Sequence, residues 1–482
     1  MSPLARHATR QRAANDIVVQ VVARVLNLAI GVVVTAFVVR TLGNSGYGQW
    51  STLLIVIGLV GYFGAFGMEG VALRESAREP EREHEWIGAV TMFRLLLVVP
   101  VMLASLIAVV ALQESHQMLI AGVILIVTMP FGGASALILL FQLRVDNRVP
   151  MFLLTLRSLL WGAAVAIIYL NNGDMVDLAI AMAVTNALVA LAEFAAVLRA
   201  GIRWPRPSRK RLGPLFRLGL PVGISGLLIT SYATIDQVIV FVIAGSKSAG
   251  LYGAVYNVLN QAHFIPASVL TTLAPVLAAS WPLDRARMLR TARLTAELLS
   301  VASFGALAYV SVAATQIVRL FFGPEFLQAA SALPVLGAAF IFISFGYLNG
   351  NLLVTMGLEK RLLRISLLAL GVNLVGNLIL VPLTGFMGAA WMTLVTEIVV
   401  FAAALRIVLR TLELPRPKLG RIGRTISAAL LLGVALAVTK LLGGELIALS
   451  VAACLLYPAL LFGLRALDLD DVRILLKRGR YA

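Results

Sequence analysis

About fourteen runs of apolar residues follow one another along this chain of 482 residues. A helix needs roughly 20 apolar residues to cross about 30 Å of hydrocarbon, so fourteen such helices consume most of the sequence. Of all residues, 60% are hydrophobic and only 13% are charged, whereas soluble domains carry about 25% charged residues. The sequence therefore predicts an all-α integral membrane protein with about 14 transmembrane helices and no separate soluble domain.

The lysine and arginine residues are distributed unevenly between the two ends of these runs. If the amino terminus lies in the cytoplasm, 33 of the 40 Lys and Arg residues fall on the cytoplasmic side and three fall within helices. The other four lie outside: Arg40, Lys247, Arg319 and Lys440. Because basic residues resist translocation, this bias predicts that both termini are cytoplasmic. It also accounts for the net charge of +17 without a nucleic-acid partner.

Two basic segments that contain prolines divide the predicted helices into groups. Residues 201–213 carry five Lys or Arg residues, and residues 411–421 carry three. These segments predict an amino-terminal six-helix lobe (1–200), a cytoplasmic linker (201–213), a second six-helix lobe (214–410), a second linker (411–421), and two extra helices with a basic cytoplasmic tail (422–482).

The two lobes share a short pattern, which favours an internal repeat. Residues 43–48 read GNSGYG and residues 248–253 read SAGLYG, and a shift of about 205 residues superposes the two Tyr-Gly pairs. Chance similarity between glycine-rich turns is the alternative, because glycine is favoured in any tight turn. Parallel six-helix repeats bind substrate at the interface between halves and expose it alternately to each side.

One face of the first predicted helix is polar, although its neighbours are apolar. The face consists of Gln20, Arg24, Asn27, Gly31 and Thr35, spaced three or four residues apart. Arg24 lies about 13 Å into the span, where an arginine costs roughly 2.5–3.5 kcal/mol. The stripe predicts that Gln20, Arg24 and Asn27 line a substrate cavity. Alternatively, Arg24 reaches back to the cytoplasmic interface or pairs with Asp236 or Glu397.

Three more arginines are candidates for contact with an anionic substrate. Arg94 and Arg157 lie within predicted helices but without a polar stripe around them, so extension of their side chains to the membrane interface is the favoured alternative. Arg40 lies at the outer end of the first helix, where it would meet a departing substrate or a lipid phosphate.

The second lobe carries amide, carboxylate and aromatic side chains of the kind that bind sugar hydroxyls. Tyr232, Asp236, Asn257 and Asn260 are predicted to line the cavity, although hydrogen bonds between helices would also explain them. His263 and Glu397 lie within apolar runs. They are candidates for ion coupling or for a counter-ion role, and packing is the simpler explanation for a lone histidine.

No catalytic motif is found in the sequence. It has neither a His-Glu-x-x-His zinc motif nor a phosphate-binding Walker loop. Its one cysteine, Cys454, lies in an apolar run and offers no disulfide or metal cluster. We therefore expect a protein that is not an enzyme and holds no cofactor or metal. Energy for transport would come from an ion gradient, the membrane potential or consumption of the product.

Several segments resemble one known family. They are residues 40–49 (RTLGNSGYGQ), 67–78 (GMEGVALRESAR), 232–257, 322–326 (FGPEF) and 385–390 (GFMGAA). They resemble the polysaccharide transporter family, the Wzx-type flippases of lipid-linked oligosaccharides within the MATE/MOP flippase superfamily, over about residues 15–410. The resemblance implies that the two six-helix bundles adopt a MATE-like arrangement.

The same resemblance implies a function. A flippase of this kind moves undecaprenyl-pyrophosphate-linked oligosaccharide across the bacterial inner membrane by alternating access, for exopolysaccharide or O-antigen synthesis. Its expected partners are that substrate, membrane lipids, a polysaccharide polymerase, export proteins and a coupling cation. The alternatives are a cation-coupled drug exporter, which Arg24 disfavours, a peptidoglycan-precursor flippase, or a non-transporting scaffold of a polysaccharide assembly complex. A glycosyltransferase or polymerase would need larger polar loops.

Overall fold

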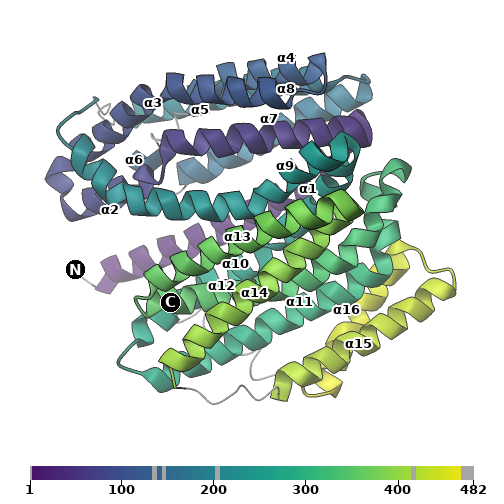
Figure 1. Ribbon diagram of the computed structural model, residues 1–482. Coiled ribbons are helices and arrows are strands. Elements are labelled where there is room, and N and C mark those ends of the chain that lie inside the picture. The colour runs from purple at the N-terminus through teal and green to yellow at the C-terminus, as the bar shows by residue number, and fades with distance from the viewer. Residues whose placement is uncertain (1–2, 133–137, 144–147, 201–206, 414–419, 468–482) are drawn as a thin grey trace. The chain divides into compact units, whose positions relative to one another are not determined.

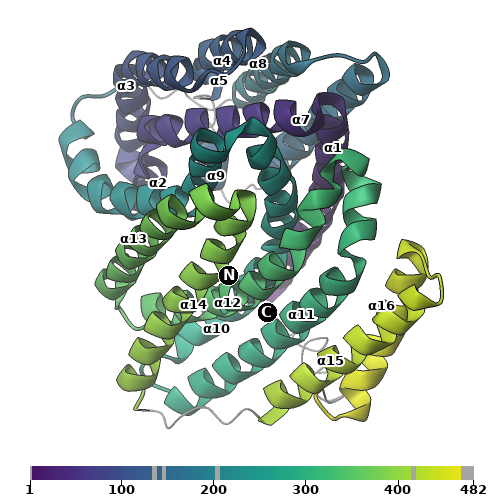
Figure 2. The ribbon, with the colours of Figure 1, turned by 45° about the vertical axis from the view of Figure 1, so that its right-hand side comes forward.

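The computed structural model describes residues 3–132, 138–143, 148–200, 207–413 and 420–467, and within these ranges the chain is helical with no strand (Figures 1 and 2). The chain divides into two compact units, Met1–Gly250 and Leu251–Ala482. Parts of both predicted linkers and most of the predicted basic tail lie outside the described residues. The lobe and linker boundaries stay predictions.

The first unit contains eight helices and a short 3-10 turn among the described residues, and a ninth helix continues into the second unit. They are α1 (Pro3–Ala65), α2 (Met68–Arg78), η1 (Pro80–Arg82), α3 (Glu83–Leu112), α4 (His116–Val127), α5 (Met129–Gly132), α6 (Ile138–Leu143), α7 (Arg148–Leu170), α8 (Met175–Arg199) and α9 (Leu212–Ala262). α1 packs against α3 and α7, and α8 packs against α4 and α7.

Both α1 and α9 are interrupted by a glycine near a predicted outer turn. At 1.5 Å per residue, the 63 residues of α1 would extend about 95 Å as one straight helix, roughly three membrane thicknesses. Gly43 breaks it with φ 65° and ψ −177°, and Gly245 breaks α9 with φ 81° and ψ 169°. A positive φ is accessible to glycine at little cost. Gly43 is the first residue of the glycine-rich pattern at 43–48, and Gly245 lies three residues before the pattern at 248–253.

The second unit is built from the remaining helices. They are α10 (Phe264–Ser280), α11 (Arg285–Phe321), η3 (Pro324–Ala332), α12 (Leu333–Thr355), α13 (Glu359–Thr384), α14 (Phe386–Thr411), α15 (Gly420–Leu441) and α16 (Leu446–Gly463). α14 packs against α12 and α13, and α11 packs against α10 and α12. The predicted extra helices, α15 and α16, pack on α11.

Eleven helical stretches in the described residues are long and apolar enough to cross a membrane, and the apolar stretch His116–Phe131 is shorter. Two of the eleven stretches, Ala29–Arg78 and Leu212–Ser280, contain the glycine breaks. The predicted all-α, multi-pass class is confirmed. The number of about 14 crossings stays a prediction.

Candidate transport site

The described part of the predicted stripe on α1 packs against α7. Asn27 donates a hydrogen bond to the hydroxyl of Thr155 at 3.2 Å. Gly162 of α7 lies against this side of α1, so a Cβ there would approach Val34 at 3.3 Å. The side chains of Gln20 and Arg24 lie outside the described residues, and their role in a cavity stays a prediction.

Four charged side chains from four helices meet inside the first unit. Arg94 of α3 forms a salt bridge with Glu69 of α2, and the Arg94 side chain is only 15% exposed. Glu193 of α8 is buried and interacts electrostatically with Arg157 of α7 and with Arg94. Arg94 therefore has acidic partners within the protein, whereas Arg157 is exposed.

The two carboxylates of this cluster were missed from the sequence. A signal was available, because Glu193 is a single charge within the apolar run of α8. A carboxylate in such a run is costly unless it is paired, so it predicts a cationic partner at similar depth. Glu69 gave no comparable signal, since α2 also contains Arg74, Glu75 and Arg78, a density of charge typical of a solvated helix.

Asp236 of α9 is buried within the first unit, beside a hydrogen bond from α9 to α1. It is 2% exposed, and its Oδ1 accepts a hydrogen bond from the backbone N–H of Gln237 at 2.8 Å. The Gln237 side chain donates to the hydroxyl of Ser51 at 2.5 Å. Tyr232, one turn earlier on α9, is partly buried, and Arg40 is exposed shortly before the break of α1 at Gly43.

The turns at the two glycine breaks contact each other. The hydroxyls of Ser45 and Ser246 are 2.8 Å apart and share a hydrogen bond. A Cβ on Gly48 would overlap the carbonyl oxygen of Ser246, and a Cβ on Gly250 would overlap that of Asn44. Only glycine permits two backbones to approach this closely.

In the first half of α9, before the break at Gly245, three glycines leave room for large side chains of other helices. A Cβ at Gly219 would overlap Met68, one at Gly223 would overlap Phe66, and one at Gly226 would overlap Tyr62. The glycines recur at i, i+4 and i+7, which places them on one helical face. In this structure the glycines form a contact face that extends along α9.

In the second unit, both predicted coupling residues lie near Tyr347 of α12. The ring of His263, at the junction of α9 and α10, lies edge-on to Tyr347 at 6.2 Å and stacks on Phe340 at 6.5 Å. Glu397 of α14 is buried and interacts electrostatically with Tyr347. The His263 Nε2 atom is buried and has no hydrogen-bond partner among the described residues. The structure thus brings two of the predicted residues to one aromatic neighbour.

The two predicted amides of α9 are less enclosed. Asn257 accepts a long hydrogen bond, 3.5 Å, from the side chain of Gln261, and Asn260 is exposed. The backbone oxygen of Asn260 accepts a hydrogen bond from the backbone N–H of His263 at 3.2 Å. The role of both amide side chains in binding substrate stays a prediction.

A further polar pair inside the second unit was not predicted. Asn377 of α13 donates to the carbonyl oxygen of Asn373 at 2.8 Å, and both residues are buried. Elsewhere in this unit, the hydroxyls of Tyr252 of α9 and Thr393 of α14 are 3.0 Å apart. Asparagines four residues apart within an apolar run were the available signal in the sequence.

No group of three or more His, Cys, Asp or Glu side chains arranged to hold a metal occurs in the described ranges.

Residues 13–281 of the chain match the family described as polysaccharide biosynthesis protein. The probable flippase AglR of Haloferax volcanii is 23% identical over 412 residues, which cover 82% of this chain and 81% of AglR. An uncharacterized membrane protein of Methanocaldococcus jannaschii is 27% identical over 187 residues, 38% of this chain, and the match spans only 36% of that relative's length.

Two solved structures share the fold. The lipid II flippase MurJ in an inward closed conformation matches with a TM-score of 0.71 and 13% identity, over 92% of this chain and 97% of MurJ. An inward-facing multidrug resistance MATE family transporter of the MOP superfamily matches with a TM-score of 0.65 and 15% identity, over 81% of this chain and 94% of the transporter. The expected MATE-like fold is confirmed. From the match over more than half of its length, the chain belongs to the polysaccharide biosynthesis protein family.

Proposed function

We propose that the protein is a flippase that moves an undecaprenyl-pyrophosphate-linked oligosaccharide from the cytoplasmic to the periplasmic leaflet of the bacterial inner membrane. The family match over residues 13–281 carries this proposal. It is supported by the likeness to a probable flippase along most of the chain and by a fold shared with transporters. The polysaccharide would be an exopolysaccharide or an O-antigen, and a polymerase and export proteins would receive the product.

The charged cluster of the first unit supports an anionic cargo. Charges within a membrane protein usually face the bundle interior or a water-filled cavity, and they mark substrate or ion pathways. Arg94 is held by Glu69, while Arg157 is exposed near the buried Glu193. An incoming pyrophosphate would compete with Glu193 for Arg157, because guanidinium groups bind phosphate oxygens in a bidentate manner. Arg24 would add a further positive charge on the same substrate path.

The contact between the two outer turns supports a cycle of alternating access. Ser45 and Ser246 share a hydrogen bond, and Gly48 and Gly250 allow the two backbones to meet. These turns would touch when the protein is closed on the outer side. Release of substrate would then require these turns to separate, as in the rigid-body motions typical of transporters.

The residues around Tyr347 would couple transport to an ion. Glu397 and His263 are both titratable and largely enclosed by the second unit. Protonation of Glu397, or binding of a cation beside it, would change the charge of this interior and so favour one state over the other. On this proposal, the second unit would couple transport to the ion, while the charged cluster of the first unit would bind the substrate.

A peptidoglycan-precursor flippase is the second candidate function. Two observations favour it: the TM-score of 0.71 with a lipid II flippase, and the pair of helices α15 and α16 beyond α14. A cation-coupled drug exporter shares the fold as well, but Arg24 on the proposed substrate path would repel a cationic drug.

Complementation in two bacterial hosts tests the proposal. The gene is expressed in one strain that lacks its Wzx-type flippase and in a second strain depleted of its lipid II flippase. We expect polysaccharide export to return in the first strain and growth not to return in the second. Rescue of the second strain alone would assign the protein to peptidoglycan synthesis. Rescue of neither strain, at normal protein level in the membrane, would contradict a flippase of either kind.

A further inference from the structure

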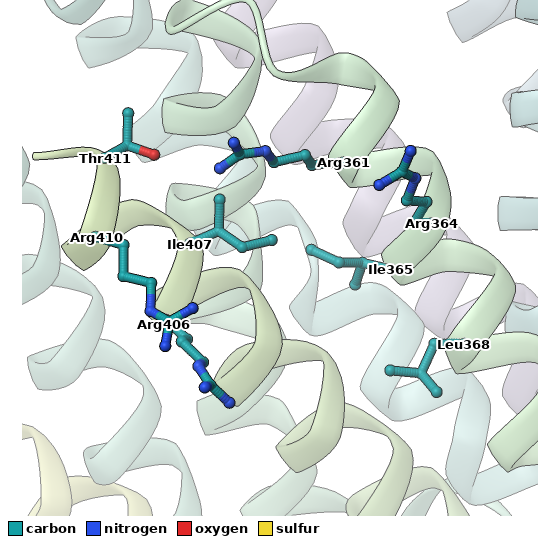
Figure 3. Close-up of a pocket in the computed structure, with 8 residues that line it drawn as sticks. All are labelled: Arg361, Arg364, Ile365, Leu368, Arg406, Ile407, Arg410 and Thr411. Carbon is teal, nitrogen blue, oxygen red and sulfur yellow. The ribbon is translucent and has the colours of Figure 1, made fainter.

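Four arginine side chains surround one cavity of the second unit, where α13 begins and α14 ends (Figure 3). They are Arg361 and Arg364 of α13 and Arg406 and Arg410 of α14, and the cavity has a volume of about 800 Å³. The cavity is distinct from the charged cluster of the first unit and from the residues around Tyr347.

The spacing of these arginines along the chain explains why they meet. Arg361 and Arg364 are three residues apart in the first turns of α13, and Arg406 and Arg410 are four residues apart in the last turns of α14. Each pair therefore lies on one helical face. α13 and α14 are consecutive, are joined by the short turn at Gly385 and pack against each other. The start of the first helix consequently lies beside the end of the second.

No carboxylate among the described residues forms a salt bridge that would neutralise the positive charge of this cavity. In the part of the chain that the structure describes, none of the four arginines forms a salt bridge, although Arg211 and Arg421 at other helix starts pair with glutamates. The carbonyl end of α14 favours nearby cations, but that effect is typically only about 0.3–1 kcal/mol. Four like charges around one cavity therefore call for an anionic ligand.

Apart from Thr411, the remaining wall of the cavity is apolar. Ile365 and Ile407 lie between the two helices, and Leu368 lies one turn further along α13 with 47% of its surface exposed (Figure 3). Beyond Leu368, α13 continues with the exposed side chains of Val375 and Leu378, which are 57% and 51% exposed. A ligand that binds the arginines can thus extend an apolar chain along the same helix. This combination fits an amphiphile better than a free phosphate.

We propose that this four-arginine pocket binds the head group of a membrane phospholipid that carries two phosphates, with its acyl chains along α13. Two arginines per phosphate suit bidentate recognition, and basic pockets between transmembrane helices on the cytoplasmic side are typical sites for such head groups. On the predicted topology, both helix ends are cytoplasmic, so the lipid belongs to the inner leaflet. The pocket serves as a lipid site whether or not the proposed cargo is correct.

Native mass spectrometry of the full-length protein in detergent tests this site. The probes are diphosphatidylglycerol, phosphatidylglycerol, undecaprenyl diphosphate and inorganic pyrophosphate, each titrated alone. We expect diphosphatidylglycerol to bind most tightly. The double variant Arg406→Gln with Arg410→Gln should weaken its binding at least about tenfold, because each lost charge-assisted hydrogen bond is worth about that much.

The matched control removes the same charge elsewhere on the same side of the second unit. Arg285 and Arg290 of α11 are exposed and form no salt bridge among the described residues, so Arg285→Gln with Arg290→Gln should leave the affinity within about twofold. Equal loss in both double variants would show nonspecific attraction and overturn the proposal.

The comparison of ligands gives two further outcomes that would overturn the proposal. Tighter binding of undecaprenyl diphosphate would assign the pocket to the cargo instead, and equal binding of inorganic pyrophosphate would rule out a lipid site. The single variant Arg410→Gln, which should weaken binding in the same direction, serves if the double variant does not fold.

Discussion

Replacing Gly250 by alanine should shift the protein away from the state in which the two outer turns touch. The added Cβ would overlap the carbonyl oxygen of Asn44 and lie 3.1 Å from the nitrogen of Gly48. Both neighbours are backbone atoms, which cannot rotate away as a flexible side chain would. The two turns must therefore separate by more than an ångström to reach an ordinary van der Waals distance.

The expected size of this shift follows from the cost of overpacking, typically about 1–3 kcal/mol. If the cost falls only on the closed state, the ratio of closed to open molecules should fall roughly 5- to 150-fold. Gly250 lies in a helix at negative φ, so the alanine itself imposes no backbone strain. The loss is therefore specific to the contact between the turns.

Distances between spin labels in a variant without Cys454 would measure the ratio. Labels at Asn171 and Lys247 suit the purpose, because both side chains are exposed and neither is part of the contact. Gly58→Ala is the matched control, since nothing lies within 4 Å of its added Cβ. We expect Gly250→Ala to populate a longer distance that the control does not populate. An unchanged distribution, or the same change in both variants, would refute the assignment of these turns as a closing contact.

Three further predictions concern orientation, cargo and coupling. A cysteine at Asn172 should react with an impermeant reagent in intact cells while one at Ser208 should not, and the reverse pattern would invert the predicted topology. Arg24→Glu should reduce glycan export at least about tenfold. Arg24→Lys should keep part of the export, because lysine retains the positive charge but not the bidentate fork of the guanidinium group. Normal export by the Glu variant at normal protein level would remove Arg24 from the substrate path. Glu397→Gln keeps the size of the side chain but removes its titration, so the dependence of transport on pH in proteoliposomes should flatten. A profile identical to that of the unmodified protein would exclude coupling through Glu397.

The helical class and the position of the outer turns could be predicted from the sequence because both depend on local properties. Apolar length decides whether a segment can span the membrane, and glycine decides where a helix can reverse. Gly43 and Gly245 adopt positive φ beside the predicted turns for this reason. The number of crossings was harder to predict, since the described residues of the apolar run at 118–143 belong to three short helices, α4, α5 and α6.

The partners of the candidate site residues could not be predicted, because they depend on which helices pack together. Arg94 gave a signal as a charge in an apolar run, but nothing near it in sequence indicated its salt bridge with Glu69. The helical periodicity of α1 likewise gave no indication that Asn27 donates to Thr155 of α7, and its role in a cavity stays a prediction. The placing of His263 and Glu397 around Tyr347 likewise requires three helices to be in position.

The attachment of α15 and α16 to α11 suggests how a chain of this family can gain or lose a helical pair. Tyr457 of α16 donates a hydrogen bond to the carbonyl oxygen of Val301 at 2.7 Å. Its ring lies so close to Gly305 that a Cβ at that position would overlap it. The hydroxyls of Tyr309 and Ser450 share a hydrogen bond at 2.6 Å. Without the pair, α11 would lose these contacts but keep its packing on α10 and α12. The main hydrophobic core of the second unit is formed by α10 to α14 without α15 and α16, so the pair is an addition that this core does not require, although it also packs on α11 through α15.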